Sequence, residues 1–257
     1  MDRDILLEAL STLTGARVKP YTELQARTVA GPQTLRGGIV RQNELTIDNY
    51  LTTIFGVGYG PLVSGQVLKS VCTPAEKELF VNMEQLFDQQ FDYDFRSGSD
   101  SSRPSRGGES YSRPWGWYRC ALRVLNKYPG GNAWLGSPGW REESSPGEWP
   151  VSFHGTSIEG AKGIPGSHYK PGPGQVYGRG IYSTPDICEA IQYAKNFTFR
   201  NKTYRVIMQN RINPQNRVQT SRKDYWLISI PEGTSPAKEK EIVEASIRPY
   251  GILIKEM

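Results

Sequence analysis

Three short motifs in the second half of the chain carry residues suited to chemistry. His154-Gly155-Thr156 comes first, Gly180-Ile181-Tyr182 follows, and Tyr193 lies eleven residues after Tyr182. A tyrosine ring can stack on a flat heteroaromatic ring, and the backbone beside a glycine can approach a ligand closely. A histidine ring can bond to hydroxyl groups. Together these groups suit a site that holds NAD by its nicotinamide end.

The chemistry of such a site follows from the bond that it would break. Cleavage between nicotinamide and ribose needs no general acid, because the leaving nicotinamide is already cationic. The site must hold the nicotinamide, orient the ribose and tolerate an oxocarbenium-like transition state. NAD is therefore the expected substrate. The cysteines Cys72, Cys120 and Cys188 lack metal-ligand spacing, and no metal is expected.

The ordered motifs resemble the catalytic domain of the poly(ADP-ribose) polymerase (PARP) type, which is related to diphtheria toxin. The resemblance covers about residues 151–255. Upstream, the blocks Arg113-Pro114-Trp115-Gly116-Trp117, Trp134-Leu135-Gly136 and Glu148-Trp149-Pro150 resemble the approach to this motif in fungal PARP-like proteins, and neuralized-like proteins carry a similar block. By this resemblance, residues from about 95 onward form one unit.

The resemblance also implies roles for individual residues. His154 would bond ribose hydroxyls, and Gly155 would hold the carboxamide through its backbone. Tyr182 and Tyr193 would sandwich the nicotinamide. The residues expected to bind NAD are His154, Gly155, Thr156, Tyr182, Ser183 and Tyr193, and those expected to act in catalysis are His154, Tyr182 and Tyr250.

Two departures from the family pattern bear on activity. A serine that normally bonds the carboxamide is replaced by Ala190, and Ser183 or Thr184 would have to substitute. The glutamate expected on the last strand falls at Pro249 or Tyr250, and residues 245–255 contain no carboxylate. That glutamate normally supports chain elongation, so its absence argues against polymer formation.

Other carboxylates are candidates for the missing group. Glu241 and Glu244 qualify if the register of the last strand is shifted, although a helical turn or loop of solvated charges is the favoured interpretation of this segment. Glu148, just before the histidine strand, is a further candidate for which a structural role is favoured.

Composition sets the protein class. The chain has 257 residues, a net charge of +5 and a pI of about 9.0. It has no apolar run near the ~20 residues of a membrane span, and its acidic start, MDRDILLEAL, does not resemble a secretory signal. Isolated cysteines are typical of a reducing compartment. We therefore expect a cytoplasmic or nuclear protein without a membrane partner.

The spacing of apolar residues predicts the elements that position the motifs. Helices are expected at residues 1–13, at 74–91 after the cap Thr73, and after the cap Thr184, with Pro185 at the first helical position. Strands are expected at residues 117–125, 150–153, 203–212, 225–230 and 248–255. Residues 95–113, rich in Ser, Gly and Arg, are expected to form a mobile loop.

Five tryptophans, at positions 115, 117, 134, 140 and 149, gather between this loop and the histidine. Packing of a loop-rich region onto a sheet is the favoured interpretation, and an aromatic cage for a ligand is the alternative.

The pattern of strands and helices predicts an α+β fold with a largely antiparallel sheet and few helices. The resemblance implies that this fold is of the ADP-ribosyltransferase type, with a split sheet. Residues 1–94 are expected to be a helical, turn-rich extension, and residues 95–257 the transferase domain. The expected function is single ADP-ribose transfer from NAD to a macromolecule, with a protein as the favoured acceptor over nucleic acid. The alternatives are an NAD- or ADP-ribose-binding protein without turnover and a nucleic-acid-binding or -modifying protein.

Overall fold

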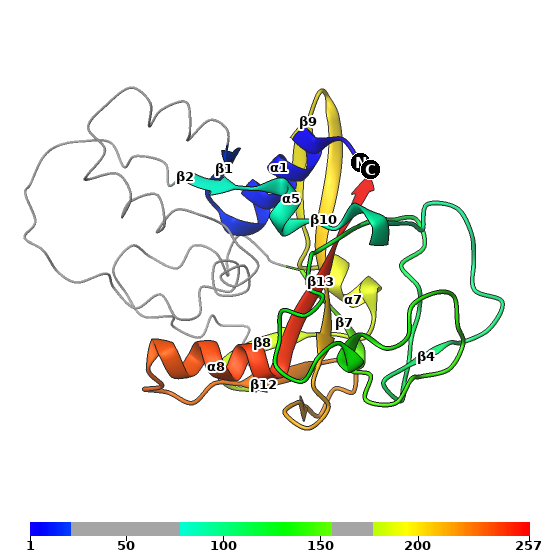
Figure 1. Cartoon of the computed structure of the whole chain (residues 1–257), viewed down its shortest axis with the longest axis vertical. Coiled ribbons are helices and arrows are strands. Elements are labelled where there is room, and N and C mark those ends of the chain that lie inside the picture. The colour runs from blue at the N-terminus through cyan, green and yellow to red at the C-terminus, as the bar shows by residue number, and fades with distance from the viewer. Residues whose placement is uncertain (22–77, 156–176) are drawn as a thin grey trace, which may run out of the picture.

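The structure, a computed structural model, describes residues 1–21, 78–155 and 177–257. It is an α+β structure with few helices and mostly antiparallel strands, which confirms the coarse class that the sequence predicts. The main sheet has the strand order β3-β6-β13-β10-β7, and β9 pairs with β10 outside this path (Figure 1). Its strands are β3 (Tyr93–Asp94), β6 (Tyr118–Ala121), β7 (Val151–His154), β9 (Lys195–Phe199), β10 (Lys202–Ile212) and β13 (Ile247–Glu256).

The long strands β10 and β13 form the centre of this sheet. They pair antiparallel, and β13 is buried from Ile247 to Ile254. Because both faces of the sheet are covered, apolar residues run continuously in Ile252-Leu253-Ile254 instead of alternating with polar ones. The register shifts between Gln209 and Asn210, which pair with Gly251 and Pro249. This β-bulge leaves Tyr250 outside the ladder of paired residues.

A second sheet lies beside β7 and brings the two main motifs together. It has the order β11-β12-β8, made of β11 (Val218–Gln219), β12 (Trp226–Ser229) and β8 (Gly180–Ser183). Phe153 and Thr184 exchange two backbone hydrogen bonds of 2.7 and 3.0 Å, which join β7 to β8. The histidine strand and the Gly180-Ile181-Tyr182 strand are therefore direct neighbours.

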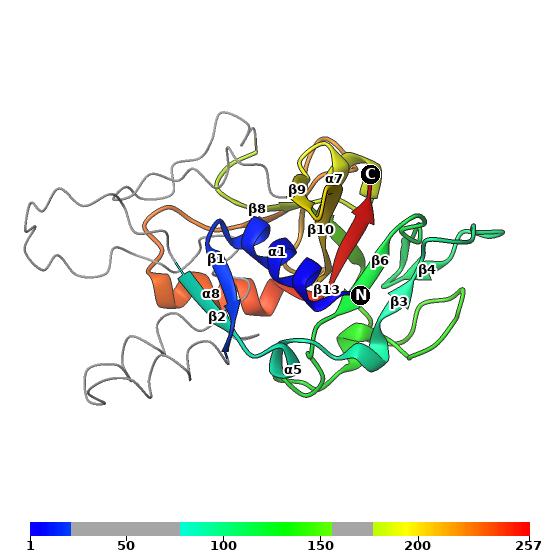
Figure 2. The same ribbon diagram turned by 90° about the horizontal axis from the view of Figure 1, so that it is seen from above.

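The predicted first helix is confirmed as α1 (Arg3–Thr14), and it packs on the same core as the sheets. Its apolar face of Leu6, Ala9, Leu10 and Leu13 is buried within the cluster that also holds β10 and β13. In both views α1 lies beside β9, where Lys195 Nζ donates to the Thr12 carbonyl at 2.8 Å (Figures 1 and 2). The described part of the extension also contains the parallel pair β1 (Arg17–Pro20) and β2 (Glu78–Val81).

The helix predicted over residues 74–91 is wrong within its described part. Residues from Glu78 onward form β2, then the short helices α5 (Met83–Leu86) and η1 (Gln89–Phe91). The Asn82 side chain accepts from the backbone N–H groups of Glu84 and Gln85, so a new helix begins there. Pairing of β2 with β1 outweighs the helical spacing of the apolar residues. The predicted cap Thr73 lies outside the described residues.

The mobile loop predicted over residues 95–113 is also wrong. This segment contains the hairpin of β4 (Ser105–Arg106) and β5 (Glu109–Ser110), and Arg106 and Arg113 are buried. Hydrogen bonds to the carbonyl of Arg141 hold both guanidinium groups. Buried arginines therefore anchor this segment, although it has few apolar residues.

The tryptophans pack a loop-rich layer onto the sheet, as the favoured interpretation held. Trp117 and Trp134 are buried, the latter in the short helix η2 (Ala133–Leu135), whereas Trp140 is exposed. Tyr128, Trp134 and Trp149 do form an aromatic cage, but Arg248 occupies it, with its guanidinium carbon 4.3 to 5.2 Å from the three ring centroids. Cation–π contacts with a residue of the chain itself account for this cage.

The remaining predicted elements are present with altered ends. The strands predicted in the second half correspond to β7, β10, β12 and β13, while the strand predicted over 117–125 shortens to β6. The helix after Thr184 is α7 (Ile187–Ile191), and its cap is Asp186, which accepts from the Cys188 N–H. The charged segment near the end is the helix α8 (Pro236–Ser246). No helix within the described residues is long and apolar enough to cross a membrane.

Candidate functional site

The structure brings His154 and the Gly180-Ile181-Tyr182 strand into direct contact. His154 ends β7, Tyr182 lies on the adjacent β8, and His154 Nδ1 is 2.6 Å from the Tyr182 carbonyl oxygen. A carbonyl oxygen can only accept, so Nδ1 carries the hydrogen and Nε2 is the acceptor in the neutral ring. The backbone of the second motif thus sets the orientation and tautomer of the histidine in the first.

The His154 ring is neutral over the physiological pH range. Burial lowers the pKa of His154 from 6.5 to about 4, and the nearby Lys195 ammonium also lowers it, against the raising effect of the bond to Tyr182. Lys195 is itself buried, and desolvation lowers its pKa. A neutral imidazole can accept a hydrogen bond through Nε2, which suits the binding of a hydroxyl group.

This pKa shift predicts acid sensitivity of the fold. The unfolded chain takes up the His154 proton near pH 6.5, and the folded chain only near pH 4. Protons therefore favour unfolding in this interval, and the free energy of unfolding should fall by roughly 3 kcal/mol as the pH drops from 6.5 to 4. Urea unfolding at several pH values measures it. In His154→Gln this part of the pH dependence should disappear, whereas His168→Gln, which removes the other histidine, should retain it.

Gly155 fits where no other residue would. A Cβ atom at this position would lie 2.3 Å from the Ala190 carbonyl oxygen and 2.7 Å from the Tyr193 carbonyl carbon. The end of β7 is therefore pressed against the backbone at the end of α7 and just after it. Thr156, the third residue of the motif, lies outside the described residues.

Tyr182 and Tyr193, which are expected to sandwich the nicotinamide ring, form hydrogen bonds with different groups of the protein. The Tyr182 hydroxyl donates to the Gly178 carbonyl at 2.7 Å and accepts from the Tyr177 N–H at 3.1 Å. Tyr193 is 44% exposed, and its hydroxyl lies 2.7 Å from that of Tyr225. The structure therefore holds Tyr193 at the surface beside β12 and fixes Tyr182 to the turn before β8.

Ser183 lies directly across from His154. Because Thr184 pairs with Phe153, the preceding residue Ser183 opposes the following residue His154 on the same face. Ser183 Oγ is buried and has no hydrogen-bond partner, whereas Thr184 Oγ1 accepts from the Asp186 N–H. Of the two substitutes considered for the serine replaced by Ala190, Ser183 is the one with an uncommitted hydroxyl.

Tyr250 points away from His154. His154 pairs with Met208, and Met208 pairs with Ile252, so the position on β13 that shares the His154 face is apolar. The Tyr250 ring instead lies between the guanidinium groups of Arg119 and Arg211, at 5.5 and 5.2 Å. These arginines extend from the opposite face of the sheet. The β-bulge at Tyr250 is a feature that the sequence did not reveal.

The carboxylates of α8 that could replace the missing glutamate form ion pairs with other residues. Glu241 and Glu244 lie on the exposed side of α8 and pair with Lys238 and Lys240 at 2.9 and 3.6 Å. Glu239 in the same helix is buried and forms an ion pair with Arg179, just before β8. The prediction of solvated charges in this segment is therefore wrong at Glu239.

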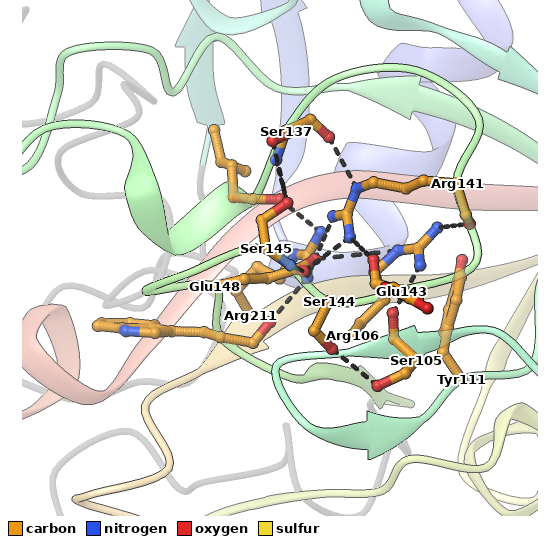
Figure 3. A network of polar contacts seen from close by, with 12 residues as sticks. Ser105, Arg106, Tyr111, Ser137, Arg141, Glu143, Ser144, Ser145, Glu148 and Arg211 are labelled. Atoms are coloured by element: carbon orange, nitrogen blue, oxygen red, sulfur yellow. Dashed lines mark hydrogen bonds and ion pairs between the residues drawn. The ribbon is translucent and has the colours of Figure 1, made fainter.

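Glu148 is the centre of a buried ion network (Figure 3). Its carboxylate accepts from Arg141 and, at 2.7 Å, from Arg211 Nη1, and it lies 3.8 Å from Arg106 Nε. Burial alone raises the pKa of Glu148, but its bonds to the arginines and to the Ser145 N–H outweigh burial and leave the pKa below its usual value. This residue joins the 95–150 layer to β10, as the structural interpretation held.

The described residues offer no group of three or more metal-ligating side chains. Sequence reasoning missed Lys195 and the buried polar pair Ser152 and Asn210, which all lie near His154. Their pairing across β7, β9 and β10 is set by register, and no local signal marks it.

The chain was also compared with known proteins: no family model matches it, and no curated protein does.

Proposed function

We propose that this protein binds NAD at His154 and Tyr182 and transfers a single ADP-ribose unit to a macromolecular acceptor. One observation carries the proposal: the backbone of the Tyr182 strand holds the His154 ring neutral and in one tautomer, with Nε2 as an acceptor. A ribose hydroxyl is the donor that such an acceptor suits. The resemblance of the ordered motifs to the PARP type supplies the identity of the ligand.

The residues of this site fit NAD at several points. Ser183 Oγ, directly across from His154, is a buried group that lacks a partner and would bond a polar group of the ligand. Tyr193 is an exposed ring on which a nicotinamide can stack. In the proposed reaction the bond between ribose and nicotinamide breaks, nicotinamide leaves with the bonding electrons, and an acceptor nucleophile attacks the ribose carbon and loses its proton.

Transfer of one unit, in preference to a polymer, follows from the last strand. The position of β13 that shares the His154 face is Ile252, and Tyr250 points to the opposite face. Neither offers a carboxylate to activate a ribose hydroxyl as the next acceptor.

A second candidate, binding of NAD or ADP-ribose without turnover, is favoured by Lys195. Its buried ammonium lies near His154 and adds to the lowering of the imidazole pKa, of which burial is the main cause. An oxocarbenium-like transition state carries positive charge, so a nearby cation raises its free energy. The same cation attracts a phosphate group and would assist binding.

Incubation of the purified chain with NAD labelled in its adenylate part, with and without cell lysate, separates the candidates. Release of nicotinamide together with macromolecule-bound label, both lost in His154→Ala, would support the transferase. Protease and nuclease digestion would then identify the acceptor. Saturable NAD binding without release would support the second candidate, and the absence of binding would refute both.

A further inference from the structure

Three buried polar side chains near His154 have no hydrogen-bond partner. They are Ser183 on β8, Ser152 on β7 and Asn210 on β10. Ser152 and Asn210 are fully buried, and Ser183 is 5% exposed. Both amide atoms of Asn210, the donor Nδ2 and the acceptor Oδ1, are unpartnered. Buried polar groups without partners destabilise a fold, so such groups require an explanation.

The register places these three residues on one face, next to one another. Ser152 and Asn210 are directly paired across β7 and β10, which brings their Cβ atoms to about 5 Å. Ser152 and His154 are two residues apart on β7 and so point to the same side. Ser183 opposes His154 on the other neighbouring strand. The unpartnered groups therefore form a continuous polar patch with the imidazole, spanning three strands.

The chemistry of the patch defines what it would bind. Its members are uncharged, and Asn210 presents a donor beside an acceptor. A complementary group carries an acceptor beside a donor, as an amide or an adenine edge does. NAD contains two such groups: the carboxamide of nicotinamide and the N6/N7 edge of adenine.

We infer that Ser183, Ser152 and Asn210 form a polar floor for the ligand at His154, with Asn210 bonding an amide-like edge of NAD through two hydrogen bonds. This inference rests on the proposed function, since NAD is the ligand. Because Ser152 and Asn210 are fully buried, the residues that cover this face must move for NAD to reach them. The unpartnered groups thus destabilise the free protein, and their hydrogen bonds to NAD would strengthen its binding.

The test therefore measures two quantities for each variant: its thermal stability without ligand and its affinity for NAD. Ser152→Ala, Ser183→Ala and Asn210→Leu each remove an unpartnered group, so without ligand their midpoints of thermal unfolding should equal or exceed that of the wild type. Their NAD affinity, measured by titration calorimetry, should instead fall, by about tenfold or more for Asn210→Leu. The two serine variants change little volume and keep the test valid if Asn210→Leu does not fold.

Gln209 provides a matched control. It is the neighbouring residue on β10, is fully buried and has an unpartnered Oε1, but it faces the side of Phe153, away from His154. Gln209→Leu should therefore bind NAD with wild-type affinity. Titration with nicotinamide alone and with ADP-ribose alone shows whether Asn210 bonds the carboxamide or the adenine edge. Asn210→Leu should weaken the binding of only one fragment, the one that carries the bonded group.

The outcomes separate the two proposals. If the wild type binds NAD, His154→Ala binds weakly and all three floor variants bind like the wild type, the polar floor is refuted and the proposed function stands. An equal loss of affinity in Gln209→Leu would also refute the floor, because it would show a general effect of core changes on β10. If the wild type binds no NAD, both proposals fall.

Discussion

His154→Ala is expected to abolish turnover of NAD, with nicotinamide release at least about 100-fold below that of the wild type. The variant loses the acceptor nitrogen that would orient the ribose. The ring also contacts the Tyr182 carbonyl oxygen, so its removal deletes one contact between β7 and β8 where the two motifs meet. Release of nicotinamide from NAD at pH 7.5, followed by chromatography, measures the effect.

Two comparisons show whether this loss is specific. His168→Ala removes the other histidine and should retain activity. Circular dichroism and the unfolding midpoint of His154→Ala at pH 7.5 should show a folded protein, since β7 keeps its backbone pairing with β10. Full activity in His154→Ala would refute the assignment of the site, whatever its effect on stability. If the protein only binds NAD, the same variant should show the loss as weaker binding.

Glu148→Gln is expected to lower the free energy of unfolding by about 3–5 kcal/mol, the largest change in stability that we predict for a single substitution. The glutamine keeps the shape of the side chain but removes the negative charge that Arg106, Arg141 and Arg211 share. Three guanidinium groups would then remain close together without a compensating charge. A loss of this size is a large fraction of the total stability of a typical domain.

Urea unfolding at pH 7.5 measures this loss, and Glu241→Gln is the control. Glu241 also pairs with a cation, Lys238, but both side chains are exposed, so its replacement should cost less than about 1 kcal/mol. Similar small changes in the two variants would show that the Glu148 network is not held together by its charge. Arg141 and Arg211 also donate to backbone carbonyls, and those bonds would then be sufficient.

The sequence predicted the parts of the fold that depend on local signals. The strands β7, β10, β12 and β13 follow from runs of β-branched and aromatic residues, and α1 follows from its spaced leucines and alanine. Such elements are encoded within a few residues of chain, and their existence and type can therefore be predicted. Their ends were less certain, because caps such as Asp186 compete with equally suitable neighbours such as Thr184.

The errors in the prediction occurred where distant segments decide the structure. Residues 78–81 lie within the segment 74–91, whose apolar spacing predicts a helix, but they form β2, because β1, far earlier in the chain, offers a partner strand. The segment 95–113 looks mobile but is ordered, because Arg106 and Arg113 reach backbone groups of a segment some 30 residues later. No window of local sequence contains these partners.

For the candidate site, the amino-acid sequence specifies which chemical groups are present and in which order: a histidine, a glycine and two tyrosines, with no carboxylate over residues 245–255. How these groups lie in space depends on the folded chain. The pairing of Phe153 with Thr184 sets His154 against Tyr182 and Ser183, and the bulge beside Gln209 sends Tyr250 to the other face. A strand alternates its side chains between faces, so a single shift of register determines which residues meet, and register depends on partners that lie far away in the sequence.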